Sequence, residues 1–243
     1  MVDTSAPDIS VVVPVHNEAG AAGPLAREIA QAFAGRSYEM IFVNDASRDA
    51  TLAELRALKA ELPALRVLSH GSNAGQSRAV RTGVLAARAP IVVTLDGDGQ
   101  NPPADAPRLV DLLAASPPTV ALVGGVRAKR QDSEAKRWAS RWANRIRKKL
   151  LSDDAADTGC GLKAFRRDVF LRLPYFDHIH RYLPALMIRE GYENRYLDVD
   201  HRHRETGQSK YTNWGRLMAS LSDLLGVMWL KSRSRRPGEV SEL

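Results

Sequence analysis

Short apolar runs alternate with amphipathic segments through the first half of this chain, and this alternation limits the possible folds more than any other feature. Five runs are rich in Val and Ile, as fully buried strands are, and span residues 9–15, 40–43, 65–68, 91–95 and 120–123. Apolar residues between the runs recur at helical spacing. Such alternation predicts an α/β fold with a mostly parallel sheet and helices on both faces.

Turn residues mark where the predicted helices begin and end. Pro24 suits the first position of a helix, and Gly35 suits the position just after its end. Asp49 is placed to cap the next helix, and Asp105 precedes another run of regularly spaced leucines. We therefore expect a helix after each of the first four strands.

Polar side chains collect where the predicted strands end. Glu18 and Asp45 follow the first two strands, and Asp96 and Asp98 follow the fourth. Ligands of such sheets bind beyond the carboxyl ends of the strands. Alternate residues of an extended chain share a face, so Asp96 and Asp98 can present two carboxylates to one Mg²⁺ or Mn²⁺ shared with substrate phosphates. The alternative, an acidic turn in solvent, is less consistent with the buried run that precedes the pair.

Three other nucleotide or metal motifs do not fit. An EF-hand that starts at Asp96 needs glycine where Asn101 stands. The segment 159–164 matches a loose G-x-G-x-x-A, but a polar stretch precedes it instead of the strand that a dinucleotide loop requires. The chain contains no P-loop motif G-x-x-x-x-G-K-[ST]. A single cysteine, Cys160, excludes a disulfide framework within the chain.

Five segments together resemble the family 2 glycosyltransferases of GT-A fold. They span residues 11–18, 43–49, 73–83, 96–103 and 199–211, and the last reads V-x-H-x-x-R-x-x-G-x-S-K-Y. This tail is more specific than the D-x-D pair, and it is similar to that of the polyprenyl-phosphate glycosyltransferases typified by dolichyl-phosphate mannose synthase. The resemblance implies inverting transfer of a sugar from a UDP- or GDP-linked donor to a polyprenyl (undecaprenyl- or dolichyl-type) phosphate.

The resemblance also implies roles for single residues. The nucleotide sugar would be bound by Pro14, Glu18 at the ribose, Asp45 at the nucleobase, and Asp96. The Mg²⁺ or Mn²⁺ would be bound by Asp96, Asp98 and Gln100. Asp157 matches the position of a carboxylate that faces the acceptor, where it would orient the phosphate or act as a weak base; the alternative is an ordinary turn aspartate. The acceptor phosphate would be bound by His201, Arg204, Ser209 and Lys210.

Basic residues are concentrated in residues 127–150. Ten Lys or Arg occur from 127 to 149, and Trp138 and Trp142 lie on one helical face, which predicts a basic amphipathic helix at a membrane interface. An ordinary surface helix is the alternative. Arg127 and Arg130 could instead reach the site and bind the acceptor phosphate.

We expect one catalytic domain at residues 1–211, with a flexible start at 1–8, and a C-terminal amphipathic helix with a basic tail at 212–243. No leader-like or membrane-spanning run is apparent, so we expect a cytoplasmic protein attached peripherally to the membrane, either directly, through a separate membrane subunit, or as a homo-oligomer.

Three alternative functions can be compared with this one. A transferase that acts on a saccharide hydroxyl would need a firm base and no S-K-Y tail. A nucleic-acid-binding protein would explain the net charge of +7 but not the acidic strand ends, so no nucleic acid is expected. A catalytically silent scaffold would not need Asp96, Asp98 and Lys210. The pairs His178 and His180, and His201 and His203, could each place two imidazoles on one strand face, as metal ligands often sit, but no third ligand accompanies either pair. We expect His201 to contact phosphate, and the other three to be structural or to support residues that contact a ligand.

Overall fold

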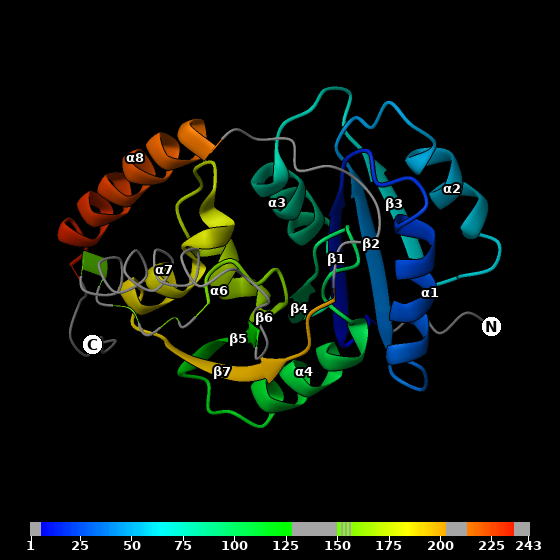
Figure 1. The fold of residues 1–243 in the computed structure, drawn as a ribbon. Helices are drawn as coiled ribbons and strands as arrows, with labels where there is room; N and C mark the ends of the chain where they lie inside the picture. The colour runs from blue at the N-terminus through cyan, green and yellow to red at the C-terminus, as the bar shows by residue number, and fades with distance from the viewer. Residues whose placement is uncertain are drawn as a thin grey trace, which may run out of the picture.

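A computed structural model describes residues 6–127, 150–151, 153, 155, 157–202 and 213–235 of the protein. Its centre is a seven-stranded sheet in the order β3-β2-β1-β4-β6-β5-β7 (Figure 1). The strands are β1 Ile9–Val15, β2 Tyr38–Asn44, β3 Leu65–Ser69, β4 Ile91–Thr94, β5 Val120–Arg127, β6 Lys163–Arg166 and β7 Glu193–Val199. Only β6 runs antiparallel to its neighbours, so the predicted mostly parallel α/β sheet is confirmed.

Helices cover both faces of the sheet. They are α1 Ala22–Ala32, α2 Thr51–Leu58, α3 Gln76–Ala86, α4 Ala106–Ala114, α6 Arg167–Arg172, α7 Leu183–Arg189 and α8 Asn213–Ser232, with short 3₁₀ turns η1 Pro103–Asp105 and η2 Ile179–Arg181. Residues of α1, α2 and α4 form one apolar core with the sheet, and residues of α3, α6, α7 and α8 form the other. Figure 1 shows α1 and α3 on opposite sides of β1.

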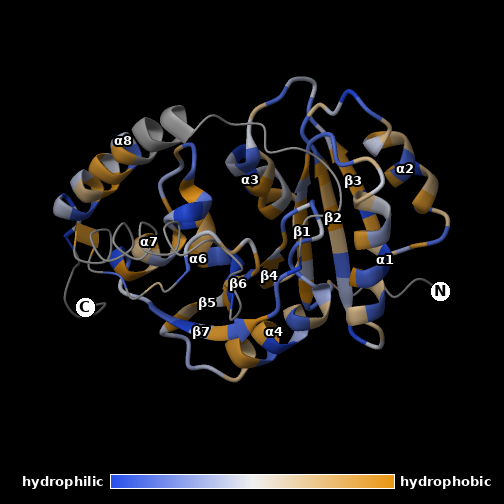
Figure 2. Ribbon diagram, viewed as in Figure 1, coloured by the Kyte–Doolittle hydropathy of each residue, from blue (hydrophilic) through white to orange (hydrophobic). Residues whose placement is uncertain are grey.

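The alternation of side chains along the strands creates these two cores. In β1, Val11 and Val13 belong to the first core, while Val12 belongs to the second. All three are fully buried, and Figure 2 shows β1 and β2 as largely hydrophobic. A strand buried on both faces reads as a continuous apolar run, which is why the sequence indicates these strands clearly.

The predicted boundaries differ from the observed ones in a few places. The first helix begins at Ala22, so Pro24 is its third residue and not its first. Asp49 lies one residue before the residue that caps α2, although its carboxylate still accepts the Thr51 N–H at 3.0 Å. β6 has no counterpart in the sequence prediction because it has only four residues, two of them cationic.

Candidate active site

The carboxyl ends of β1, β2 and β4 meet at one edge of the sheet, because these three strands are parallel neighbours. Glu18, Asp45 and Asp96 therefore lie at the same edge, as predicted. The backbone is strained at two of these strand ends: Asn17 and Ala46 have φ angles of 54° and 55°, in the left-handed region that disfavours residues with a Cβ. Such strain is frequent at functional sites.

Hydrogen bonds hold these two strand ends together. The Asn17 N–H donates to Ser47 Oγ at 2.9 Å, and the Arg48 N–H donates to Asn17 Oδ1 at 2.7 Å. The Glu18 N–H donates to Thr51 Oγ1 at 2.9 Å, and the residue is half-buried beside the start of α2. The position of Glu18 thus depends on contacts between β1 and β2, whose ends the sequence places side by side.

Asp45 is buried and binds the loop that leads into α3. Its Oδ1 accepts from the Ala74 N–H at 2.8 Å and contacts His70 Nδ1 at 2.7 Å, and its Oδ2 accepts from the Gly75 N–H at 2.8 Å. A carboxylate offers about four lone-pair positions, so these contacts use three of them. The predicted contact with a nucleobase would have to use the position left on Oδ2. Positioning the 73–75 loop is the role that the geometry gives to Asp45.

Asp96 lies in a cradle built by three distant segments. Gln76 Nε2, at the start of α3, donates to Asp96 Oδ1 at 2.8 Å, and Asn101 Nδ2 lies 3.5 Å from Oδ2. Gly161 forms the third wall, because a Cβ at this position would overlap the Asp96 carboxylate. Burial and the charge of the nearby Asp98 raise the pKa of Asp96.

The reason given for pairing Asp96 with Asp98 needs correction. β4 ends at Thr94, and residues 97–98 form a turn, so the two carboxylates are not brought together by strand alternation. The turn still leaves them close enough for Asp98 to raise the pKa of Asp96. Asp98 Oδ1 accepts from the Gln100 N–H at 3.1 Å, so the predicted third ligand belongs to the same turn.

The residues of this turn fit a divalent cation. The charge of Asp98 disfavours the ionisation of Asp96, so a bound positive charge would stabilise the Asp96 carboxylate, and oxygen donors suit Mg²⁺ or Mn²⁺. Among the residues that the structure describes, no three His, Cys, Asp or Glu side chains form a metal-binding group. Few protein ligands are needed where substrate phosphates complete the coordination.

Arg127 and Asp157 are paired with each other. Arg127 Nε and Nη2 donate to the two carboxylate oxygens of Asp157 at 2.6 and 2.9 Å, and both side chains are largely buried. Burial would lower the pKa of Arg127, but its hydrogen bond to Asp157 and the charge of Asp157 outweigh that effect and raise it. The sequence assigns both residues to the acceptor but does not predict this ion pair. Gly159 adjoins it, since a Cβ there would lie 3.0 Å from Arg127 Nη2.

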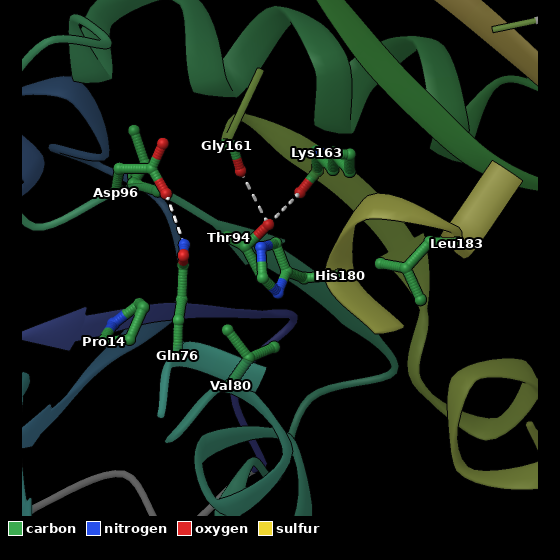
Figure 3. A pocket seen from close by; sticks show the side chains of 10 residues that line it. Pro14, Gln76, Val80, Thr94, Asp96, Gly161, Lys163, His180 and Leu183 are labelled. Carbon is green, nitrogen blue, oxygen red and sulfur yellow. Dashed lines mark hydrogen bonds between the residues drawn. The ribbon is translucent and has the colours of Figure 1, made fainter. Parts of the chain in front are cut away.

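Two basic groups lie close to Asp96 at positions that the sequence does not predict. Lys163 is buried at the start of β6, where its ammonium donates to the Cys160 carbonyl and burial lowers its pKa. His180, expected to be structural, lines a pocket beside Asp96 together with Gln76 (Figure 3). Both residues lie in patterns that the sequence analysis considers, the segment 159–164 and the pair of His178 with His180, but neither pattern indicates a position beside Asp96.

His178 does not share a strand face with His180. It precedes η2 with a φ of 62°, and its Nδ1 lies 2.8 Å from Asp223 Oδ2 of α8. The possibility that these two imidazoles share a strand face is therefore not realised.

The start of the predicted tail motif lies beside the turn of Asp98. The Asp200 N–H donates to Asp105 Oδ2 and the Arg202 N–H donates to the Gln100 carbonyl, each at 2.8 Å, and His201 stands between these two anchors. The other predicted acceptor residues, Arg130, Arg204, Ser209 and Lys210, lie outside the described residues, as does most of the basic segment 127–150.

The chain is similar in sequence to known glycosyltransferases. Residues 10–173 match the family described as Glycosyl transferase family 2, and the chain belongs to this family. Dodecaprenyl-phosphate galacturonate synthase of Rhizobium johnstonii is 34% identical over 237 residues, which cover 95% of this chain and 69% of that protein. Undecaprenyl-phosphate 4-deoxy-4-formamido-L-arabinose transferase of Pseudomonas aeruginosa is 35% identical over 224 residues, which cover 90% of this chain and 65% of that protein. This chain thus spans about two thirds of the length of these curated relatives.

Solved structures share the fold. Glucosyl-3-phosphoglycerate synthase from Mycobacterium tuberculosis in complex with phosphoglyceric acid has a TM-score of 0.67 at 19% identity, over 96% of this chain and 82% of that one. A mannosyltransferase from Pyrobaculum calidifontis in complex with GDP-Man and Mn²⁺ has a TM-score of 0.65 at 20% identity, over 97% of this chain and 67% of that one. The predicted GT-A-like fold is confirmed. No helix among the described residues is long and apolar enough to cross a bilayer.

Proposed function

We propose that this protein is an inverting, metal-dependent glycosyltransferase that moves a sugar from a nucleotide diphosphate donor to a polyprenyl phosphate at a membrane surface. One observation carries the choice of acceptor: relatives 34–35% identical over 90–95% of this chain are named for transfer to dodecaprenyl or undecaprenyl phosphate. The carboxylates at the sheet edge support the choice of donor, since they suit a cation that binds a diphosphate.

The proposed reaction is a single displacement. A phosphate oxygen of the acceptor attacks the anomeric carbon, the bond from that carbon to the diphosphate oxygen breaks, and the nucleoside diphosphate leaves. A Mg²⁺ or Mn²⁺ held by Asp96 and Asp98, with Gln100 nearby, would supply charge neutralisation of the leaving diphosphate. Glu18 would bind the ribose, and Pro14 would contact the donor from the end of β1.

The ion pair between Arg127 and Asp157 is consistent with a phosphate acceptor. A phosphate monoester has a second pKa of about 6, so it is largely ionised near neutral pH and needs no strong base. A carboxylate that already accepts two hydrogen bonds from a guanidinium is a weak base for a sugar hydroxyl. Asp157 would therefore orient Arg127 toward the acceptor. The tail residues His201, Arg204, Ser209 and Lys210 would bind the same phosphate.

Helix α8 supports the membrane part of the proposal. Leu221, Leu225 and Trp229 recur every four residues and are 51%, 58% and 59% exposed, and they are three of the five large hydrophobic side chains exposed in the described part of the chain. The opposite side of the helix packs on the second core through Val227. Lys231, Arg233 and Arg235 follow at its C-terminal end, where they would contact anionic headgroups.

The test is a transfer assay with undecaprenyl phosphate in anionic liposomes, Mn²⁺ and a panel of UDP- and GDP-linked sugars. We expect a glycolipid product, detected by mass spectrometry, that requires the metal and is found with the pelleted liposomes. Neutral liposomes at high salt serve as the control for attachment. Transfer to an added oligosaccharide with no glycolipid product would instead establish the alternative acceptor, a saccharide hydroxyl.

A further inference from the structure

A pocket lies beside Asp96, at the carboxyl ends of β1 and β4. Its lining includes Pro14 of β1, Gln76 of α3, His180 of η2 and Leu183 of α7 (Figure 3). About 300 Å³ of empty space lies between its walls, a volume that includes open solvent, so a ligand here would be only partly enclosed. The walls are mostly apolar and carry a few polar groups, which is the usual composition of a ligand site.

His180 presents an unused hydrogen-bonding group in this pocket. Its Nδ1 lies 2.7 Å from the hydroxyl of Ser77, which is fully buried at the start of α3. Within the described part of the chain, this is the only hydrogen bond of the His180 ring, so Nε2 is available to a ligand. Nε2 is a donor if Ser77 donates to Nδ1, and an acceptor if Nδ1 carries the proton. Figure 3 shows the imidazole among the pocket side chains, between Thr94 and Leu183.

The electrostatics of the pocket suit an uncharged, hydroxyl-bearing ligand. Burial lowers the pKa of His180 well below its usual value of 6.5, and the nearby Lys163 and Arg181 lower it further, so the imidazole is neutral. Asp96 and Lys163, which carry opposite charges, both border the same pocket, so the lining has no excess of either charge. A neutral imidazole and an amide are therefore better matched to sugar hydroxyls than to the phosphate of the acceptor.

We infer that this pocket receives the sugar ring of the donor, and that His180, held by Ser77, binds one of its hydroxyl groups. The inference rests on the proposed function, because a diphosphate bound near Asp96 and Asp98 places the attached sugar next to it. His180 is then a residue that determines which sugar is transferred. Gln76 lines the same pocket and donates to the Asp96 carboxylate, so its amide would lie close to the bound sugar.

The chain offers a matched control for His180. His178 is two residues away, but its ring contacts Asp223 of α8 and does not line the pocket. Its positive φ is tolerated by asparagine, so His178→Asn and His180→Asn compare the same substitution inside and outside the pocket. Ser77→Ala is a second test variant, since it releases the imidazole and leaves the ring in place.

The experiment measures the affinity of each variant for UDP, GDP, UDP-glucose, UDP-galactose, UDP-glucuronate and GDP-mannose in Mn²⁺, by calorimetry. For the conjugates that the wild type binds, we expect His180→Asn to lower the affinity about tenfold, as for the loss of one hydrogen bond, and to leave the affinity for the free nucleoside diphosphate unchanged. Ser77→Ala should show a smaller loss in the same direction, and His178→Asn none. Discrimination between the epimers UDP-glucose and UDP-galactose should also diminish in His180→Asn.

Other outcomes overturn the inference in distinguishable ways. Equal losses for the free nucleotide and its sugar conjugate would make His180 a structural residue. An increased KM for undecaprenyl phosphate with unchanged donor affinity would place the pocket on the acceptor side. A wild type that binds none of the nucleotides would contradict the proposed function, and with it this inference.

Discussion

Glu39 and Asp96 are carboxylates at opposite edges of the same sheet, and their surroundings differ in almost every respect. Glu39 lies near the beginning of β2 and is only 2% exposed. It accepts hydrogen bonds from Ser10 Oγ at 2.8 Å and from the Arg88 N–H at 2.7 Å, and it is paired with the guanidinium groups of Arg66 and Arg88. Burial acts against its ionisation, but these hydrogen bonds and charges prevail and lower its pKa.

Asp96 has the opposite balance. Its hydrogen bonds from Gln76 and Asn101 are fewer and come from neutral amides, and the nearest carboxylate, Asp98, repels it. The pKa of Asp96 is raised, so ionisation of its carboxyl group lowers the free energy of unfolding. A buried charge with full compensation stabilises a fold, whereas one without it is poised to bind a cation. The comparison separates a structural edge of the sheet from the edge that we propose to be functional; we call these the structural edge and the functional edge.

The largest expected effect concerns the functional edge. Asp96→Asn should reduce sugar transfer at least ~10²-fold, because the variant loses the charge of a proposed metal ligand at the point where we propose that the leaving diphosphate is stabilised. The stability of the metal-free protein should stay the same or increase, since the change relieves the repulsion from Asp98. Transfer assays and urea unfolding in EDTA measure the two effects. A variant that unfolds readily would show that Asp96 is structural after all.

The structural edge should respond in the reverse way. Glu39→Gln should lower the free energy of unfolding by about 2–3 kcal/mol, since hydrogen bonds to charged partners are lost while Arg66 and Arg88 can still reach solvent. The transfer rate of the folded fraction should change little. Glu61→Gln is the matched control, because its ion pair with Arg27 is half exposed and should contribute almost nothing. If Glu39→Gln lost transfer activity but kept its stability, Glu39 would be a functional residue and not a structural one.

The sequence predicts the functional edge better than the structural one. The buried strands and the polar residues that follow them are local signals, so the sequence alone is enough to place Glu18, Asp45, Asp96 and Asp98 at one edge. Glu39 attracts no attention in the sequence, because its partners Ser10 and Arg88 come from other strands and loops. A network that is assembled only in the folded state has no motif.

The same limit explains which contacts within the site the sequence does not predict. Ser77 and His180 are 103 residues apart and meet only through the packing of η2 on α3. Gly161 lies in the segment that the sequence analysis sets aside as a dinucleotide loop, yet the absence of its side chain makes room for Asp96. The ion pair of Arg127 with Asp157 likewise joins two residues that the sequence treats separately.

The smallest expected effect is a difference in pH dependence between the two edges. Glu39 has a folded pKa below its usual 4.5, so its contribution to stability is present above that pH and is lost as the pH falls through the folded pKa. Asp96 has a folded pKa above its usual 3.8, so its ionisation reduces stability as the pH rises above 3.8. The two groups therefore act with opposite sign.

Urea unfolding in EDTA between pH 3.5 and 7 resolves these contributions as differences from the wild type. As the pH rises, the free energy of unfolding of the wild type should increase relative to that of Glu39→Gln. Over the same rise in pH, it should decrease relative to that of Asp96→Asn. Each slope is limited to about 1.4 kcal/mol per pH unit, because a single proton is involved. Each variant's free energy of unfolding is subtracted from that of the wild type at the same pH. This subtraction removes the contribution of the other carboxylates, provided that they do not interact with the altered residue. Slopes of the same sign would mean that Asp96 is compensated in the folded protein as fully as Glu39, and the distinction between the two edges would then have no electrostatic basis.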